Sequence, residues 1–156
     1  MAKKSAGILL YRMMNEGLEI FLVHPGGPFW KNKDLEAWSI PKGEFGDEEN
    51  ALDAARREFE EETGHPVTGN FTELTPVKLK SGKMVYAWAV EGDIDAKAIR
   101  CQTFVDVEWP PHSGKFQSIP EVDKGEWLSW DKAKKKVNPS QVPLIDELTQ
   151  KISYGV

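Results

Sequence analysis

Apolar residues along most of this chain occur in short runs bounded by turn-forming residues. Residues 5–11 and 18–23 form two such runs, and Asn15-Glu16-Gly17 between them predicts a β-hairpin. A second hairpin is predicted from residues 71–80 and 84–90, which flank a Ser-Gly pair. The loop-forming residues of the chain cluster at 24–30 and 110–120. Further short strands are expected at residues 35–40, 104–109 and 126–130.

Three segments instead favour helices. The longest covers residues 47–63, with Asp47 as the expected N-cap and Gly64 after its last turn, where a left-handed conformation can close a helix. Its core face is expected to carry Leu52, Ala55 and Phe59. A short basic helix is expected over residues 131–137, and a final amphipathic helix over residues 141–152. Strand-rich segments interrupted by helices predict an α/β fold with a mixed sheet between helices.

The longest predicted helix carries Glu58, Glu61 and Glu62 along one edge of its core face. These carboxylates repel one another and lie near the negative end of the helix dipole, so local stability disfavours them. A divalent cation such as Mg²⁺ reverses that argument, because it binds carboxylate and phosphate oxygens in one shell. Arg57 lies four residues before Glu61, within reach of a carboxylate. An ordinary solvated helix face would not explain this clustering.

The same segment carries a recognisable motif. Its constrained positions are Gly43, Glu49, Arg57, Glu58, Phe59, Glu61, Glu62 and Gly64. They stand at the spacing of the Nudix box, here residues 43–65, so the chain resembles a Nudix hydrolase. The preceding WSIPKGE is also similar to that family. The resemblance extends over most of the chain and implies one Nudix domain over residues 1–156, built as an α/β/α sandwich.

By this resemblance, Glu58, Glu61 and Glu62 hold Mg²⁺ or Mn²⁺, and a backbone carbonyl near Gly43 completes the metal shell. Two residues compete as the general base. One is Glu61, and the other is Glu121, whose place in a loop before a strand resembles that of an assisting glutamate in MutT-type enzymes. Glu121 fits an ordinary surface carboxylate equally well. Arg57 is grouped with the catalytic residues because it can orient or neutralise a box carboxylate.

The candidate substrate-binding residues are Lys42, Lys83, Tyr86, Trp30 and Gln141. Lysines suit phosphates as point charges, and aromatic rings can stack on a nucleobase. Gln141 stands where MutT-like enzymes read a purine edge. Exposed strand lysines, core aromatic residues and a polar helix cap are the structural alternatives for these positions.

Together these residues predict Mg²⁺-dependent hydrolysis of a phosphoanhydride bond in a nucleoside or dinucleoside polyphosphate. Features similar to asymmetric dinucleoside tetraphosphate hydrolases and to MutT-type nucleoside triphosphate pyrophosphatases both occur, so the member of the class stays open. The alternative is a Nudix-fold module that binds a nucleotide without cleaving it, as a sensor or interaction domain. The intact glutamates count against that alternative, since a binding module has no need for them.

Composition limits the remaining possibilities. With 156 residues, 40% of them hydrophobic and 29% charged, the chain has the profile of one soluble globular domain. A net charge of −5 argues against a general binder of nucleic acids or anionic membranes. The first apolar run is too short for a signal-peptide core, and the lone Cys101 suits a reducing compartment, so cytoplasmic residence is expected. A homodimer is compatible with these properties.

Overall fold

The computed structural model describes residues 3–154 and has a mixed, 7-stranded sheet as its central layer. The main path through the sheet is β4-β6-β1-β2-β9, while β3 pairs with β1 and β5 pairs with β6. The strands are β1 (Lys4–Met14), β2 (Gly17–Pro25), β3 (Lys42–Glu44), β4 (Thr72–Glu73), β5 (Val77–Lys78), β6 (Met84–Glu91) and β9 (Val122–Ser129). Strand β1 runs antiparallel to β2 and parallel to β6.

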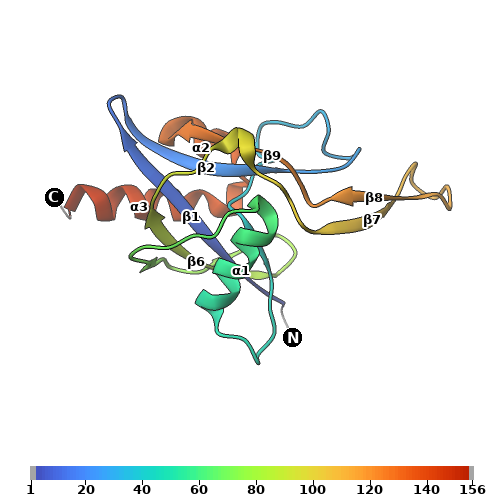
Figure 1. Cartoon of the computed structure of the whole chain (residues 1–156), viewed down its shortest axis with the longest axis horizontal. Coiled ribbons are helices and arrows are strands. Elements are labelled where there is room, and N and C mark those ends of the chain that lie inside the picture. Colours follow the sequence, from blue (N-terminus) through green and yellow to red (C-terminus); the bar gives the residue numbers. More distant parts are fainter. Residues whose placement is uncertain (1–2, 155–156) are drawn as a thin grey trace.

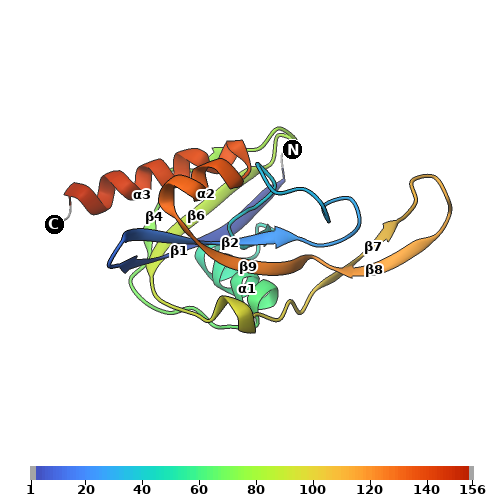
Figure 2. The ribbon, with the colours of Figure 1, turned by 90° about the horizontal axis from the view of Figure 1, so that it is seen from above.

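Helices cover both faces of the sheet, as Figure 2 shows. Helix α1 (Ala51–Thr63) packs on one face, and α2 (Trp130–Lys136) and α3 (Val142–Tyr154) lie on the other. Two short 3-10 helices, Ala96–Ala98 and Pro139–Gln141, complete the helical elements of the described residues. The α/β/α sandwich with a mixed sheet is therefore confirmed.

Strand β1 shows why the first apolar run is nearly continuous. Ile8 and Leu10 contribute to the core on the α1 side, whereas Leu9 contributes to the core on the α3 side. Successive side chains of a strand point to opposite faces, and here both faces are buried under helices. The same alternation buries Val85, Ala87 and Ala89 of β6 on the α3 side, which bears out the predicted pattern of that strand.

Helix α1 ends where the sequence predicts but begins later. Gly64 has φ 77° and donates its N–H to the Glu60 carbonyl at 2.7 Å. The expected N-cap at Asp47 is wrong: the side chain of Asn50 accepts from the Leu52 and Asp53 N–H groups at 3.0 and 3.2 Å. Asp47 is exposed and pairs with Lys4 of β1 instead.

The core face of α1 is also shifted slightly from the prediction. Ala54, Ala55 and Phe59 are fully buried, whereas Leu52 is only half-buried against the same cluster. Helix α3 does bury Leu144, Ile145 and Leu148 against the opposite face of the sheet, as expected.

The predicted loop at 110–120 is wrong. Residues Phe116–Pro120 form strand β8, which pairs antiparallel with β7 (Phe104–Glu108) as a separate 2-stranded sheet. This hairpin projects from the body of the molecule (Figure 1). Turn-forming residues such as Pro110 and Gly114 belong to its tip, and the polar Gln117 and Ser118 conceal the strand pattern in the sequence.

Two further strand predictions need correction. Residues 35–40 do not form a strand, because only Trp38 and Ser39 make isolated bridges, to Val137 and Val23. Strand β9 begins at Val122, ahead of the predicted start at residue 126. Within residues 3–154, no helix has the length and apolar character needed to cross a membrane.

Candidate active site

Strand β3 and helix α1 place Gly43 directly against the carboxylate of Glu58. Gly43 pairs with Ala6 of β1, and this pairing fixes the position of the Gly43 backbone in the sheet. A Cβ atom on Gly43 would collide with the Glu58 carboxylate. Only glycine therefore allows the carboxylate to lie this close to the β3 backbone.

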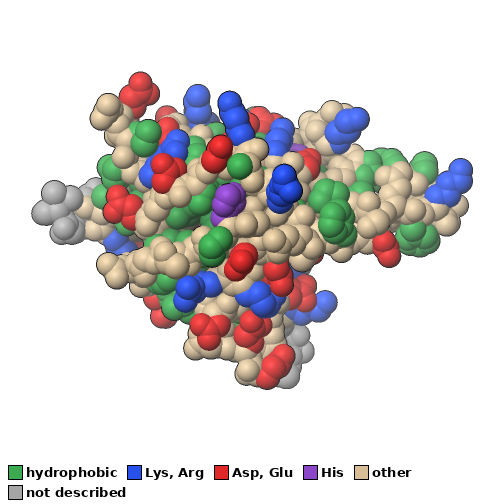
Figure 3. Space-filling model, viewed as in Figure 1, with side chains coloured by type: hydrophobic (Ala, Val, Ile, Leu, Met, Phe, Trp, Pro, Cys, Tyr) green, Lys and Arg blue, Asp and Glu red, His purple; other side chains and the backbone are tan. Residues whose placement is uncertain are grey.

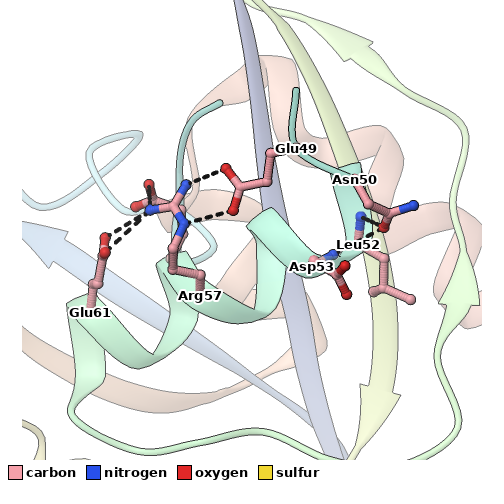
Figure 4. A network of polar contacts seen from close by, with 7 residues as sticks. Glu49, Asn50, Leu52, Asp53, Arg57 and Glu61 are labelled. Atoms are coloured by element: carbon pink, nitrogen blue, oxygen red, sulfur yellow. Dashed lines mark hydrogen bonds and ion pairs between the residues drawn. The ribbon is translucent and has the colours of Figure 1, made fainter. Parts of the chain in front are cut away.

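Arg57 links three carboxylates around the middle of α1 (Figure 4). Its Nε and Nη2 donate to the two oxygens of Glu49 at 2.8 and 2.9 Å, a bidentate pair. Its Nη1 donates to Glu58 at 2.9 Å and to both oxygens of Glu61 at 3.2 Å. The Glu49 hydrogen bond, followed by Glu58 and Glu61, raises the pKa of Arg57 above its ordinary value. Arg57 thus contacts three glutamates of the box, two of which, Glu58 and Glu61, are predicted metal ligands.

Glu62 is a buried carboxyl group whose nearby positive charge comes from Lys42. Only 6% of the residue is exposed, and burial raises its pKa to about 8. Lys42 opposes this shift, whereas Glu58 and Glu121 add to it. Oε1 of Glu62 also accepts the Lys42 backbone N–H at 3.3 Å.

Glu58 is in a similar environment. Its side chain is 12% exposed, and burial raises its pKa, with Glu61 and Glu121 adding and Arg57 opposing. Glu58 and Glu62 therefore form a partly desolvated pair of like charges. Such a pair is stabilised by a nearby cation.

Two predicted lysines lie beside these carboxylates. Lys42 is half-buried, and burial lowers its pKa, while Glu62 acts in the opposite direction. The positive charge of Lys83 is close enough to lower that pKa further. Lys83 pairs with Glu44 of β3 at 2.8 Å. The fold therefore brings both side chains to one edge of the site.

Glu121 reaches the site from the junction of β8 and β9. Two backbone hydrogen bonds fix its position. The Glu121 N–H donates to the Thr103 carbonyl, and the Glu121 carbonyl accepts from the Gly26 N–H, each at 3.1 Å. A cavity of about 170 Å³, the catalytic cleft, brings it together with residues of the box and of β2. This cleft is lined by Val23, Pro25, Ser39, Ile40, Lys42, Glu62, Glu121 and Val122.

The donor atoms of the site are of the kind that a hard divalent cation binds. Buried carboxylate oxygens beside the Gly43 peptide are the ligands that Mg²⁺ takes, and their charge is only partly offset by Lys42 and Arg57. Among the described residues, no three acidic, histidine or cysteine side chains enclose a metal-sized space. Glu58 and Glu61 instead point to Arg57, whose Nη1 donates to both carboxylates.

The remaining predicted substrate residues occupy different surroundings. Trp30 lines a second cavity, next to the cleft. Tyr86 lies on β6, with its ring edge-to-face to Phe45 at 6.2 Å between centroids. Gln141 is 1% exposed, and its amide bonds to the Ile40 N–H and the Ser39 hydroxyl, both at 3.0 Å. The Gln141 amide therefore hydrogen-bonds within the protein through both its oxygen and its nitrogen.

Sequence reasoning missed the contacts of two residues, Glu49 and His24, that support the site. Glu49 was recognised as a motif position, but its bidentate contact with Arg57 depends on how the loop before α1 folds back. His24, which is 2% exposed, has Nδ1 at 3.0 Å from Asp123 and Nε2 at 2.7 Å from the Lys33 carbonyl. These contacts fix the ends of β2 and β9 beside Glu121. No local pattern reveals a contact between residues 99 positions apart.

The model of the NUDIX domain matches residues 1–148. The chain therefore belongs to the NUDIX domain family, the class of pyrophosphohydrolases to which its box points. No protein of curated function matches the sequence significantly.

Solved structures share this fold at low sequence identity. A C. elegans Ap4A hydrolase in a binary complex is 18% identical, with a TM-score of 0.66 over 96% of this chain and 98% of that one. The NUDIX domain of Shewanella oneidensis NrtR, complexed with ADP ribose, is 17% identical, with a TM-score of 0.68 over 97% and 89%. A MutT from the study of Aliivibrio salmonicida and Vibrio cholerae is 16% identical, with a TM-score of 0.56 over 94% of each chain.

Proposed function

We propose that this protein hydrolyses a phosphoanhydride bond in a nucleoside or dinucleoside polyphosphate, with Mg²⁺ or Mn²⁺ as cofactor. The observation that carries this proposal is the Glu58 carboxylate packed against Gly43, with Glu62 bound to the neighbouring Lys42 N–H and Glu121 close enough to add to the raised pKa of both. A fold has no reason of stability to desolvate like charges in this way. A divalent cation and a polyphosphate together would offset the cost.

In this proposal Glu58, Glu61 and Glu62 hold the cation, and the carbonyl of Gly43 completes its shell. When bound, the cation neutralises nonbridging phosphate oxygens and lowers the pKa of the attacking water. Arg57 keeps Glu58 and Glu61 oriented through its contacts at 2.9 and 3.2 Å. Lys42 and Lys83 lie at the edge of the cleft, where they can contact the phosphate chain.

Of the two candidate general bases, Glu61 and Glu121, the proposal assigns the role to Glu121. Both oxygens of Glu61 accept from Arg57, whereas Glu121 is exposed at the wall of the catalytic cleft. A base at that wall can accept a proton from water beside the cation. Glu121→Gln is expected to lower kcat with little effect on metal binding, while Glu61→Gln weakens metal binding as well.

The test is hydrolysis of a panel of nucleotide polyphosphates with Mg²⁺, run in ¹⁸O water with product identification to locate the attacked phosphorus. Glu61→Gln is expected to lower kcat at least about 10²-fold. Glu60→Gln is the matched control, because Glu60 is an exposed glutamate on the same helix. Its activity should stay unchanged.

One result would favour the binding module instead. The NUDIX domain of NrtR, complexed with ADP ribose, shares the fold of this chain. If the unmodified protein and Glu61→Gln are equally inert on the whole panel while both bind nucleotide, the hydrolase proposal is wrong.

A further inference from the structure

A second cavity, of about 340 Å³, adjoins the catalytic cleft. One wall is the loop that follows β2, and the other is the root of the β7–β8 hairpin, which Figure 1 shows extending away from the sheet. We call this cavity the hairpin pocket. It is lined by Pro25, Gly26, Gly27, Pro28, Phe29, Trp30, Val105, Val107, Ile119, Pro120 and Glu121.

One face of the hairpin is directed to the pocket. Val105 and Val107 are two positions apart on β7, and Ile119 pairs with Val105 across the ladder, so all three share a face. Phe104 and Phe116 occupy the other face and are 61% and 66% exposed. The hydrophobic side chains along the projecting hairpin are seen in Figure 3.

The loop wall is built to lie close to the hairpin. Gly26 donates to the Glu121 carbonyl at 3.1 Å, and a Cβ on Gly26 would collide with the Pro120 carbonyl. A Cβ on Gly27 would collide with the Ile119 side chain. The glycines therefore allow an approach that seats the aromatic pair Phe29 and Trp30, with centroids 5.0 Å apart, beside the hairpin.

The hairpin pocket and the catalytic cleft lie next to each other. Pro25 and Glu121 line both, and Glu121 is within electrostatic range of Glu58 and Glu62. A molecule with its phosphates at the box can therefore extend into the pocket. Glu121 is the one charged residue in the pocket lining, and it is an acid, so a phosphate group is disfavoured there. An uncharged, flat group is favoured by the aromatic and aliphatic walls.

We propose that the hairpin pocket binds the nucleobase of the polyphosphate substrate, with the base stacked on the Phe29–Trp30 pair and covered by the apolar face of the hairpin. This inference rests on the proposed function and specifies where that substrate is selected. Stacking tolerates any base, so the pocket selects substrates that carry a base over bare polyphosphates. The β7–β8 hairpin is then a substrate-binding element.

The test compares two substrates and three variants of the full chain. ATP and ribose 5-triphosphate carry the same phosphates, but only ATP has a base. Phe29→Ala removes an aromatic residue that is 53% exposed, so it disturbs the fold little, and Val107→Asp puts a charge on the pocket face of the hairpin. Phe116→Ala is the matched control: it removes an aromatic residue of similar exposure that does not line the pocket.

Binding is measured separately from hydrolysis, as the Kd of methylene-bridged, nonhydrolysable ATP. Phe29→Ala and Val107→Asp are expected to raise this Kd, and the KM for ATP, about tenfold. Both variants should hydrolyse ribose 5-triphosphate like the unmodified protein, and Phe116→Ala should match it on every measure. Thermal unfolding of each variant verifies that the fold is retained.

The proposal is overturned if both pocket variants bind the ATP analogue as the unmodified protein does, or if hydrolysis of ribose 5-triphosphate falls equally. The two proposals fail in different ways. If ATP is hydrolysed but the Kd of the analogue is unchanged by Phe29→Ala and Val107→Asp, the proposed function stands and the pocket proposal is rejected. Binding of the analogue that depends on both residues, without hydrolysis of any nucleotide, supports the pocket and rejects the hydrolase.

Discussion

At the scale of single residues, the site depends on two contacts that require a particular side chain, at Gly43 and at Arg57. Gly43 has no side chain, so the Glu58 carboxylate can lie against its peptide. Arg57 has a planar guanidinium with several donors, so one side chain can contact Glu49, Glu58 and Glu61 together. Each residue positions a carboxylate, and each gives a direct test.

We predict that Gly43→Ala lowers kcat about 10²-fold, because the added methyl group must displace the Glu58 carboxylate. The matched control is Gly46→Ala, whose methyl group would meet the carboxylate of the exposed, flexible Glu48. Kinetics with a preferred nucleotide and thermal melts of both variants provide the measurement. Equal activity of the two variants would contradict the close packing described for Gly43.

We predict that Arg57→Lys lowers activity about 10- to 100-fold, although the charge is kept, because an ammonium group cannot make the bidentate Glu49 contact while reaching Glu58 and Glu61. Arg56→Lys is the control, since Arg56 is an exposed neighbour that donates to the Val67 carbonyl at 3.3 Å. The dependence of rate on Mg²⁺ concentration should shift only in Arg57→Lys. An unchanged metal dependence there would reject the orienting role of Arg57.

At the scale of elements, the start of α1 decides where the box glutamates project. The helix begins at Ala51 because the Asn50 side chain satisfies two free N–H groups, whereas Asp47 is committed to Lys4 in the preceding loop. Substitution of Asn50, the observed N-cap, should therefore lower the stability of the fold more than substitution of Asp47, the expected N-cap.

Asn50→Ala is expected to lower the free energy of unfolding by about 1 kcal/mol through loss of the cap. Asp47→Ala should change it much less, since Asp47 and Lys4 form an exposed pair. Urea unfolding of the two variants at neutral pH compares them directly. A larger loss for Asp47→Ala would restore Asp47 as the N-cap.

At the scale of the whole molecule, the buried carboxylates couple folding to pH and to metal. The pKa of Glu62 is raised from 4.5 to about 8, so the folded protein keeps a proton that the unfolded chain loses at lower pH. The stability contributed by this group is present below pH 4.5 and is lost as the pH rises towards 8.

Without metal, Glu62→Gln should therefore gain stability relative to the unmodified protein as the pH rises from 5 to 8, on the order of 3 kcal/mol. Taking the difference between the two proteins cancels the titration of other groups. Urea unfolding in EDTA at both pH values measures it. A difference that stays constant with pH would show that Glu62 titrates in its ordinary range.

Mg²⁺ is expected to raise the Tm of the unmodified protein more than that of Glu62→Gln, because a cation that binds only the folded state stabilises it by mass action. Ca²⁺ and high NaCl serve as controls for the general effects of charge and ionic strength. Equal Tm shifts in both proteins would remove Glu62 from the proposed metal ligands.

The sequence by itself determined the layered α/β fold, the main hairpins and the glutamate edge of α1. Those features depend on local properties: apolar periodicity, turn residues and the spacing of side chains along one helix. The C-cap at Gly64 was predictable for the same reason, since a glycine in the left-handed conformation closes a helix and Pro66, two residues later, cannot continue it.

Only the tertiary structure decided which distant residues share the site. The family resemblance named Gly43 and Glu121, but their positions depend on pairing: β3 sets Gly43 against Glu58, and the junction of β8 and β9 puts Glu121 within electrostatic range of Glu58 and Glu62. No local pattern contains that register. The hairpin pocket was invisible for the same reason: its walls come from the loop after β2 and from a hairpin whose second strand reads as a loop. Local patterns specify elements, whereas pairing and packing between elements specify which side chains meet.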